Sequence, residues 1–459
     1  MAVAAVVAGL GLALVAPPVD AAPTVGTTPP AVAPAPASTA VVPGRDWTLS
    51  SPEAKAMDPA LVDQALDYAF VDGRNTQGVV IVKGGQIVGE RYAKGADATS
   101  WAASWSVAKS FAGTLIGIAV DEGKIPNVEV PMTTYFPEWI GTPRAGITLR
   151  HVLQMEAGLD WDEDYYGAGG GSEIIAMVGN QRDQLAFAAD RPVEHPPGTV
   201  FNYSSGTAML LSGVLEKATG MSAEAYARTR LIEPLGFSKF DWWRDADGNT
   251  LTYCCLDTTT RDFARLGLLY LNGGRWGGKQ IISQAWVDAA TTGTAASGNS
   301  YGYQWWVQPA NGTMPAYYSA RGHDGQYIHV FPSLDLIVAR NGYYGKSPCP
   351  AVADPALLGF YPPQGLVPGW GTVDPESWSE DELLAPIVAS VTGSAYPAKT
   401  WPEPTGAKPE PSTPAPAPCP GAEGPAPAPA PAPAPESPEA PAPVVRAATP
   451  VVANPRFTG

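Results

Sequence analysis

The placement of proline confines any folded core to the middle of this chain. Of the 459 residues 49 are proline, and most of them crowd into the two ends of the sequence, where they alternate with alanine. Proline removes a backbone donor and favours an extended, solvated chain, so neither end can build a core. We therefore predict a linker at residues 22–46, a globular domain at 47–398 and a disordered tail at 399–459.

The first residues are almost wholly apolar, from Met1 to Ala16, and Val-Asp-Ala follows at 19–21. A short apolar run with small residues at its exit is typical of a secretory signal rather than of a spanning helix. No Lys or Arg precedes Arg45, so the charged start of such a signal is missing. We predict a signal segment at 1–21 and a secreted or envelope location. A start further upstream, or no export, is the alternative.

Charge and side-chain chemistry exclude several classes of partner. The formal net charge is −16 and no block of Lys or Arg stands out, which argues against nucleic acid or an anionic membrane. Of the four cysteines, Cys419 lies in the tail, and Cys349 can pair with Cys254 or Cys255 in an oxidising compartment, but connectivity is not readable from sequence. Neither cysteines nor the four histidines show metal-ligand spacing, so we expect no metal and no cofactor.

Strand-like sequence stands at both ends of the globular segment, with helical sequence between. The predicted elements are a helix, a hairpin, three strand-like runs and a last helix: Pro59–Phe70, Gly78–Lys83 with Gln86–Tyr92, Tyr301–Gln308, Gln326–Phe331, Leu334–Asn341 and Glu382–Val391. This order predicts an α/β fold of the α+β type, in which helices flank an antiparallel sheet and a mainly helical lobe is inserted at roughly residues 121–200.

The most informative helix runs from Ser106 to Val120 and is apolar nearly all round, so it belongs inside the protein. It opens with Ser106-Val107-Ala108-Lys109, the only Ser-x-x-Lys in the chain. Residues three apart share one face of a helix, so the lysine amine can reach the hydroxyl. Burial weakens the preference of lysine for its charged form, and a neutral amine can activate a serine nucleophile. A surface lysine beside a capping serine fits this apolar helix poorly.

A Ser-x-x-Lys signature is followed in serine enzymes by two further ordered elements. Residues 197–206, which contain Tyr203-Ser204-Ser205, stand in the second position, before another apolar helix. Residues 321–326, which contain His323-Asp324-Gly325, stand in the third, before a strand.

A competing motif is Gly298-Asn299-Ser300-Tyr301-Gly302, which matches the Gly-x-Ser-x-Gly nucleophile elbow. That elbow requires a hydrophobic strand before it and a helix after it. Here small and polar residues precede the motif and an aromatic, strand-like run follows. We therefore predict a loop that enters a strand.

With these motifs the chain resembles the class C β-lactamase-related serine hydrolases, especially the branch of 6-aminohexanoate-dimer hydrolases and related esterases. The resemblance covers about residues 55–395 and includes four further segments: 149–153, 157–165, 260–267 and 301–306. It implies a β-lactamase/transpeptidase-like fold and an acyl-enzyme on Ser106, with Lys109 as base. It also implies that Tyr203 is the third catalytic residue and that the backbone N–H groups of Ser106 and Gln326 form the oxyanion hole.

Two departures from the family pattern bear on the substrate. Ser205 stands where many relatives carry the Asn of Tyr-x-Asn, and His323-Asp324-Gly325 replaces Lys-Thr-Gly. The family lysine helps to hold a substrate carboxylate, so recognition of penicillins should suffer, whereas esters or linear amides fit better. We expect six residues at the substrate: Tyr165, Ser205, Trp305, His323, Asp324 and Gly325. For Tyr165, Trp305 and Trp306 a plain core position is an equal alternative.

The expected partner is thus a small amide or ester, such as a 6-aminohexanoate oligomer or a short-chain ester. A β-lactamase or a D-alanyl-D-alanine carboxypeptidase is the alternative within this class. A catalytically silent envelope protein is the alternative from another class. The proline-rich tail is interpreted as a solvated spacer, and envelope association through the tail or the first segment is the other interpretation.

Overall fold

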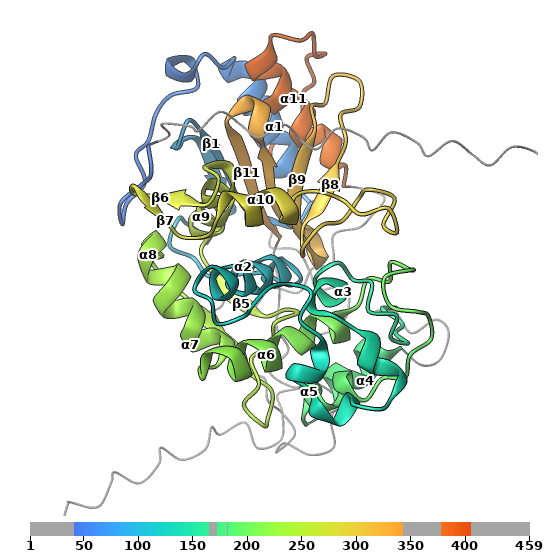
Figure 1. Cartoon of the computed structure of the whole chain (residues 1–459). Coiled ribbons are helices and arrows are strands. Elements are labelled where there is room, and N and C mark those ends of the chain that lie inside the picture. Colours follow the sequence, from blue (N-terminus) through green and yellow to red (C-terminus); the bar gives the residue numbers. More distant parts are fainter. Residues whose placement is uncertain (1–40, 165–171, 181, 343–377, 405–459) are drawn as a thin grey trace, which may run out of the picture. The chain divides into compact units, whose positions relative to one another are not determined.

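The computed structural model describes residues 41–164, 172–180, 182–342 and 378–404 (Figure 1). The predicted signal segment, most of the linker and nearly all of the tail lie outside these ranges, as do Tyr165, Cys349 and Cys419. Within the described ranges, none of the helices combines the length and the apolar character that spanning a membrane demands.

A six-stranded antiparallel sheet is built from both ends of the domain, in the order β2-β1-β11-β10-β9-β8. Its strands are β1 (Thr76–Lys83), β2 (Gln86–Tyr92), β8 (Trp306–Gln308), β9 (Tyr317–Gly322), β10 (Gln326–Phe331) and β11 (Leu336–Gly342). Because β1 pairs with β11, the N-terminal hairpin and the C-terminal strands form one sheet. The predicted α/β fold with an antiparallel sheet is confirmed.

The predicted hairpin forms β1 and β2, with Lys83 opposite Gln86. Gly84 and Gly85 make the turn with φ of 57° and 71°, a region that favours glycine. Two strand predictions were less accurate. Only residues 306–308 of the predicted 301–308 strand belong to the sheet, and β9 was not predicted at all.

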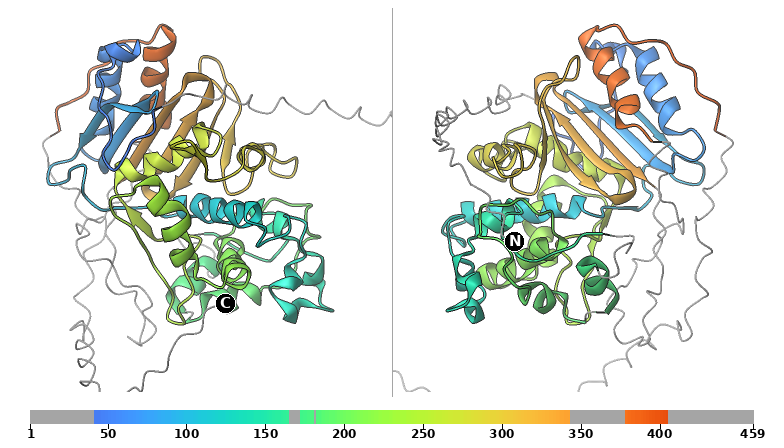
Figure 2. Two further views of the ribbon diagram at one scale, coloured as in Figure 1. Left: turned by 60° about the vertical axis from the view of Figure 1, so that its left-hand side comes forward. Right: turned by 90° about the vertical axis from the view of Figure 1, so that its right-hand side faces the viewer.

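Helices cover both faces of the sheet (Figure 2). One face packs on α1 (Pro59–Ala69) and α11 (Glu380–Thr392), and the other on α2 (Val107–Asp121) and α9 (Thr260–Leu271). Side chains alternate between these layers as the pleat of a strand requires. The cluster with α1 and α11 contains Val79 and Ile81, and the cluster with α2 and α9 contains Val80 and Val82.

The close approach of α9 to the sheet requires a glycine. A Cβ atom at Gly267 would lie 2.8 Å from Ile328 Cγ2 and 3.0 Å from Ile337 Cγ2, so a larger residue would push the helix off the strands.

The remaining elements form a mainly helical part beneath the sheet in Figure 1. They are α3 (Leu149–Leu153), α4 (Glu173–Asn180), α5 (Gln184–Ala189), α6 (Ser205–Thr219), α7 (Ala223–Ala227) and α8 (Glu233–Leu235). Helices therefore continue beyond the predicted lobe at 121–200. A small sheet has the order β3 (Ala102–Ala103), β5 (Leu256–Thr258) and β4 (Asp241–Trp242), and β3 directly precedes α2 in sequence. The last elements are β6 (Arg275–Trp276), β7 (Lys279–Gln280) and α10 (Gln284–Ala290).

The folded domain extends beyond the predicted limits of residues 47 and 398 at both ends. The buried Arg265 guanidinium pairs with Asp262 and donates to the carbonyl oxygens of Gly44 and Arg45, which were assigned to the linker. At the other end Lys399 Nζ pairs with the carboxylate of Glu382, and the Trp401 ring lies 5.0 Å from that of Tyr68. Residues 399–401 are thus packed, which corrects their assignment to a disordered tail.

Candidate active site

Ser106 and Lys109 occupy the start of α2. Ser106 is the N-cap residue and is half-buried, whereas Lys109, one turn on, is 1 % exposed. Lys109 Nζ lies 2.8 Å from Ser106 Oγ, the geometry that the three-residue spacing predicts. The hydroxyl therefore stands at the positive end of a helix dipole with an amine in contact, and both features favour formation of an alkoxide.

The amine of Lys109 is poised between its charged and neutral forms. Burial disfavours the ammonium and lowers the pKa of Lys109 to about 8, while the negative charge of Glu163 opposes this and raises it. A base whose pKa lies near the working pH is present in its neutral form to a useful extent.

Hydrogen-bond directions leave the lone pair of a neutral Lys109 facing Ser106. The Glu163 carboxylate only accepts, so the Ser205 hydroxyl must donate to its Oε1, at 2.5 Å, and must accept from Lys109 Nζ, at 3.1 Å. The carbonyl oxygen of Tyr253, 3.0 Å from Nζ, also only accepts. These two acceptors use both N–H bonds of a neutral amine, so its remaining position is an acceptor for the Ser106 proton.

Glu163 is a residue that motif analysis missed. Its Oε2 accepts from the backbone N–H of Ser205, at 2.9 Å, and from Trp161 Nε1. The carboxylate is thus held against the first turn of α6 and acts on Lys109 through Ser205. The segment 157–165 was quoted only as part of the family resemblance. Nothing local marked Glu163, because its partner Ser205 lies 42 positions away.

Tyr203 lies beside the same pair. Lys109 Nζ is 4.9 Å from the centre of its ring, and its phenol forms a hydrogen bond with Ser106. Burial raises the pKa of Tyr203, the charge of Glu163 raises it further, and the bond with Ser106 opposes the rise. Tyr203 is therefore a protonated phenol at neutral pH, suited to donate a proton. The structure brings Ser106, Lys109 and Tyr203 together.

The turn of His323, Asp324 and Gly325 lies against the residue that precedes the serine. Asp324 Oδ2 accepts from Trp105 Nε1 at 3.1 Å, and the His323 ring packs edge-on against the same indole with centroids 5.7 Å apart. Burial raises the pKa of Asp324, while His323 and the Trp105 bond lower it. The turn contains His323, Asp324 and Gly325, so it has no lysine of the kind found in the family's Lys-Thr-Gly element.

Arg340 holds the backbone of that turn. Its Nη1 donates to the carbonyl oxygens of Asp324 and Gly325, at 3.1 and 2.6 Å. Gly325 has a φ of 74°, and a Cβ atom there would lie 1.8 Å from Arg340 Nη1, so only glycine fits. Gln326 follows as the first residue of β10, opposite Gly322. The oxyanion role of the Ser106 and Gln326 N–H groups remains a prediction.

Of the two adjacent tryptophans considered for the substrate site, one lies in the core and the other beside Tyr203. Trp305 is fully buried, 4.5 Å from the ring of Tyr270 and 5.4 Å from that of Tyr318, so it is a core residue rather than a substrate contact. Its neighbour Trp306 stacks on Tyr203, with centroids 5.4 Å apart. Successive residues of an extended segment point to opposite sides, which explains why one tryptophan enters the core and the other reaches the site.

The competing motif is a loop, as predicted. Ser300 donates to the carbonyl oxygen of Ser297 at 2.6 Å, and β8 rather than a helix follows it. The nucleophile elbow is therefore absent at Ser300.

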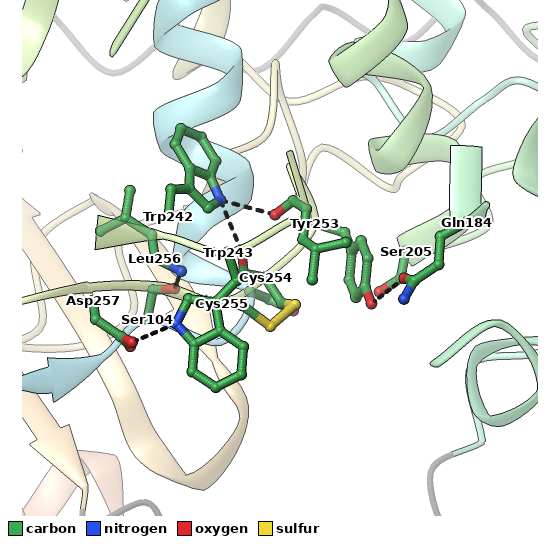
Figure 3. The surroundings of a disulfide bond; sticks show 12 residues. Ser104, Gln184, Ser205, Trp242, Trp243, Tyr253, Cys254, Cys255, Leu256 and Asp257 are labelled. Carbon is green, nitrogen blue, oxygen red and sulfur yellow. Dashed lines mark hydrogen bonds between the residues drawn. A yellow bond between two sulfur atoms is a disulfide. The ribbon is translucent and has the colours of Figure 1, made fainter. Parts of the chain in front are cut away.

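The disulfide joins two adjacent residues, Cys254 and Cys255 (Figure 3). The sequence had left the pairing open, with Cys349 as one candidate partner of either residue, and the structure joins the two neighbours instead. Cys254 directly follows Tyr253, whose carbonyl oxygen accepts from Lys109, so the disulfide lies at the site. Among the described residues no group of three or more His, Cys, Asp or Glu side chains is arranged to hold a metal ion.

Fold and site together define a hydrolase with a β-lactamase-like fold. The chain belongs to the Beta-lactamase family, whose model matches residues 62–342.

Relatives named as hydrolases agree with this family. A 6-aminohexanoate-dimer hydrolase of Paenarthrobacter ureafaciens is 27 % identical over 296 residues, which cover 58 % of this chain and 72 % of the relative. A Bacillus anthracis structure provisionally named a 6-aminohexanoate-dimer hydrolase has a TM-score of 0.54 at 24 % identity and covers 68 % of this chain and 84 % of its own. EstCE1, a hydrolase with promiscuous acyltransferase activity, has a TM-score of 0.52 at 15 % identity, covering 62 % and 93 %.

Replacing Glu163 by glutamine should move the pH profile of kcat/KM. Activity that needs neutral Lys109 rises with pH through about 8 and then levels off, because the ammonium loses its proton there. Removing the negative charge of Glu163 lowers the pKa of Lys109, so this limb should move to lower pH. Loss of a fixed direction for the Ser205 hydroxyl should also reduce the plateau at least about tenfold.

Steady-state rates on a short-chain ester between pH 5.5 and 10 test this expectation. Glu138→Gln, at an exposed position, is the matched control and should reproduce the wild-type profile. A Glu163→Gln profile that superimposes on the wild type would show that the carboxylate does not act on Lys109.

Proposed function

We propose that this protein is a serine hydrolase that cleaves esters or linear amides through an acyl-enzyme on Ser106. The observation that carries the proposal is the buried amine of Lys109, held 2.8 Å from Ser106 Oγ with its other two contacts made to acceptors. A protonated surface lysine would have no lone pair to offer. Here burial lowers the pKa of the amine, and the two acceptors orient its N–H bonds so that the lone pair of the neutral form faces the serine proton.

The first half-reaction follows from these contacts. As Ser106 Oγ bonds to the substrate carbonyl carbon, its proton passes to Lys109 Nζ. The tetrahedral species collapses when the bond to the leaving alcohol or amine breaks, and Tyr203 gives that atom a proton. The Lys109 ammonium then reprotonates Tyr203. In the second half-reaction the proton of Tyr203 first passes to Lys109, and Tyr203 then takes a proton from the water that bonds to the acyl carbon. The bond from that carbon to Ser106 Oγ breaks, the Lys109 ammonium protonates Ser106 Oγ, and the acid is released.

The N-terminus of α2 supports stabilisation of the oxyanion. The backbone N–H of Ser106 stands at the helix start, and we propose that the N–H of Gln326 is the second donor. A donor of this kind contributes about 2.7–4 kcal/mol to the transition state.

Esters and linear amides are favoured over β-lactams because of the turn at His323. Penicillin-type substrates carry a carboxylate, and here Asp324 adds a negative group where the family pattern has a fixed positive charge. The relative named 6-aminohexanoate-dimer hydrolase supports linear amides, and the one named EstCE1 is a hydrolase of the same fold.

A substrate panel tests the proposal: nitrocefin, a D-alanyl-D-alanine peptide, 4-nitrophenyl butyrate and the 6-aminohexanoate dimer. We expect the highest kcat/KM on the ester, turnover of nitrocefin at least about 100-fold lower, and a fluorophosphonate adduct at Ser106 in the intact mass. If no substrate is turned over and no adduct forms, the proposal fails and a non-catalytic envelope protein is the better interpretation. A higher kcat/KM on nitrocefin than on the ester would favour the alternative that this protein is a β-lactamase.

A further inference from the structure

A cavity of about 140 Å³ opens beside the nucleophile and is walled on one side by the adjacent-residue disulfide. Ser106 and Ser205 stand at its polar end. The rest of its described lining is apolar or aromatic and carries no charged side chain, and it includes Ile175, Trp243, Cys254 and Cys255.

Hydrogen bonds hold the chain on both sides of the disulfide, and Figure 3 shows those made by Tyr253 to Gln184 and by Leu256 to Ser104. Before it, the Tyr253 carbonyl oxygen accepts from Lys109, and the Tyr253 phenol donates to Gln184 at 2.7 Å. After it, Leu256 N donates to Ser104 Oγ at 2.9 Å, and Ser104 N donates to the Leu256 carbonyl oxygen at 2.8 Å. The two sulfurs thus have a set position relative to Ser106, two residues beyond Ser104.

The tryptophans next to the disulfide are held as firmly. Trp242 Nε1 donates to the carbonyl oxygens of Leu251 and Cys254, and Trp243 Nε1 donates to Asp257 Oδ2 at 2.8 Å. With their polar atoms engaged, these indoles present carbon surface. The cysteine residues are 2 % and 6 % exposed, and a disulfide replaces two weak S–H donors by polarisable, apolar sulfur.

The lining of the cavity also includes an exposed aliphatic residue. Ile175 on α4 is 47 % exposed, one of few large apolar side chains so exposed in the described part of the chain. A single exposed isoleucine is ordinary. One that lines the same apolar cavity as the nucleophile is a surface that a substrate would cover.

The position of Tyr203 indicates which part of a substrate enters. Tyr203 is the proposed proton donor to the leaving group, and it is not among the described residues that line the cavity, whereas Ser106 and Ser205 are. The group in the cavity is therefore the one that stays bonded to Ser106 Oγ when the leaving group departs, which is the acyl group.

We propose that this cavity is the acyl-binding pocket, that the Cys254–Cys255 disulfide is its wall, and that it selects an uncharged, apolar acyl group of hexanoyl or benzoyl size. This inference rests on the proposed acyl-enzyme at Ser106. An apolar cavity of about 150 Å³ holds a benzene molecule in another protein, which sets the size limit. A terminal ammonium, as in a 6-aminohexanoyl group, would lose hydration without gaining a charged partner among the described residues that line the cavity.

Two substrate series test the pocket. Among 4-nitrophenyl esters we expect kcat/KM for the hexanoate to exceed that for the acetate and that for the decanoate at least about tenfold each, since each buried methylene adds to binding until the cavity is full. Between ethyl hexanoate and ethyl 6-aminohexanoate, which differ by one ammonium at pH 7, we expect the uncharged ester to be preferred at least about 100-fold.

Ile175→Glu tests the charge preference with little risk to folding, because the side chain is exposed. It should lower the preference for ethyl hexanoate over ethyl 6-aminohexanoate at least about tenfold. Ile140→Glu is the matched control: Ile140 is 69 % exposed and does not line the cavity, so its preference should equal that of the wild type. If both variants changed the preference for ethyl hexanoate equally, the assignment of this cavity as the acyl-binding pocket would be wrong.

Cys254→Ala/Cys255→Gly tests the wall. Glycine suits the φ of 66° at Cys255, so the backbone can keep its path while both sulfurs are removed. The enlarged cavity should move the preferred ester from hexanoate toward decanoate, with a melting curve and fluorophosphonate labelling to verify a folded, reactive protein. An unchanged chain-length profile in a labelled variant overturns the role of the disulfide.

The outcomes separate the two levels of inference. A flat chain-length series, or a preference for the 6-amino ester, in a wild-type protein that forms the fluorophosphonate adduct overturns the pocket and leaves the proposed function standing. Absence of any adduct overturns both.

Discussion

Replacing Ser106 by alanine should lower kcat/KM for a short-chain ester at least about 10⁴-fold while the melting temperature stays close to that of the wild type. The side-chain oxygen is the atom that would bond to the substrate carbon, and the other hydroxyl at Lys109, that of Ser205, already donates its proton to Glu163 Oε1. Its removal costs little stability because Ser106 makes no side-chain cap to α2 and is half-buried. Steady-state hydrolysis of 4-nitrophenyl butyrate, with a thermal melt, measures both.

Ser300→Ala is the matched control, because Ser300 is the serine of the competing motif. Its hydroxyl makes one hydrogen bond, to the Ser297 carbonyl oxygen, and the variant should retain the wild-type rate within about threefold. Undiminished activity in Ser106→Ala, or a collapse of activity in Ser300→Ala, would contradict the assignment of the nucleophile.

Replacing Lys109 by methionine should lower kcat/KM at least about 10³-fold and abolish the rise of activity with pH through about 8. Methionine has nearly the same length and suits an apolar helix, but it offers no basic lone pair to the Ser106 proton. The same kinetics over pH 6 to 10 measure the effect, and a slower reaction of Ser106 with a fluorophosphonate is expected in parallel.

Two further variants separate a base from a positive charge. Lys109→Arg keeps the charge and the donors but cannot lose its proton near neutral pH, so it should be as inactive as Lys109→Met. Lys124→Met removes an exposed lysine one turn beyond α2 and should behave as the wild type. Substantial activity in Lys109→Arg would show that the cation, rather than the base, is what Ser106 requires.

The order of the motifs predicted where the His323 turn lies but not which residue supports it. Its place in sequence predicted a position near the nucleophile, and the contacts of Asp324 and His323 with Trp105 put it there. The sequence could not indicate that Arg340, fifteen residues beyond Gly325, holds the backbone of this turn. A side chain that supports a loop from another strand leaves no local pattern.

The sequence by itself determined the elements whose signals are local: the α1 helix, the β1–β2 hairpin, the apolar α2 helix and the contact of Ser106 with Lys109. In each of these, three or four neighbouring residues decide the geometry. The tertiary structure alone decided that Cys254 pairs with Cys255, that Glu163 reaches Lys109 through Ser205, and that Trp305 enters the core. The last two depend on which segments far apart in the chain are brought together, and the first on a backbone conformation, with a φ of 66° at Cys255, that composition and spacing do not predict.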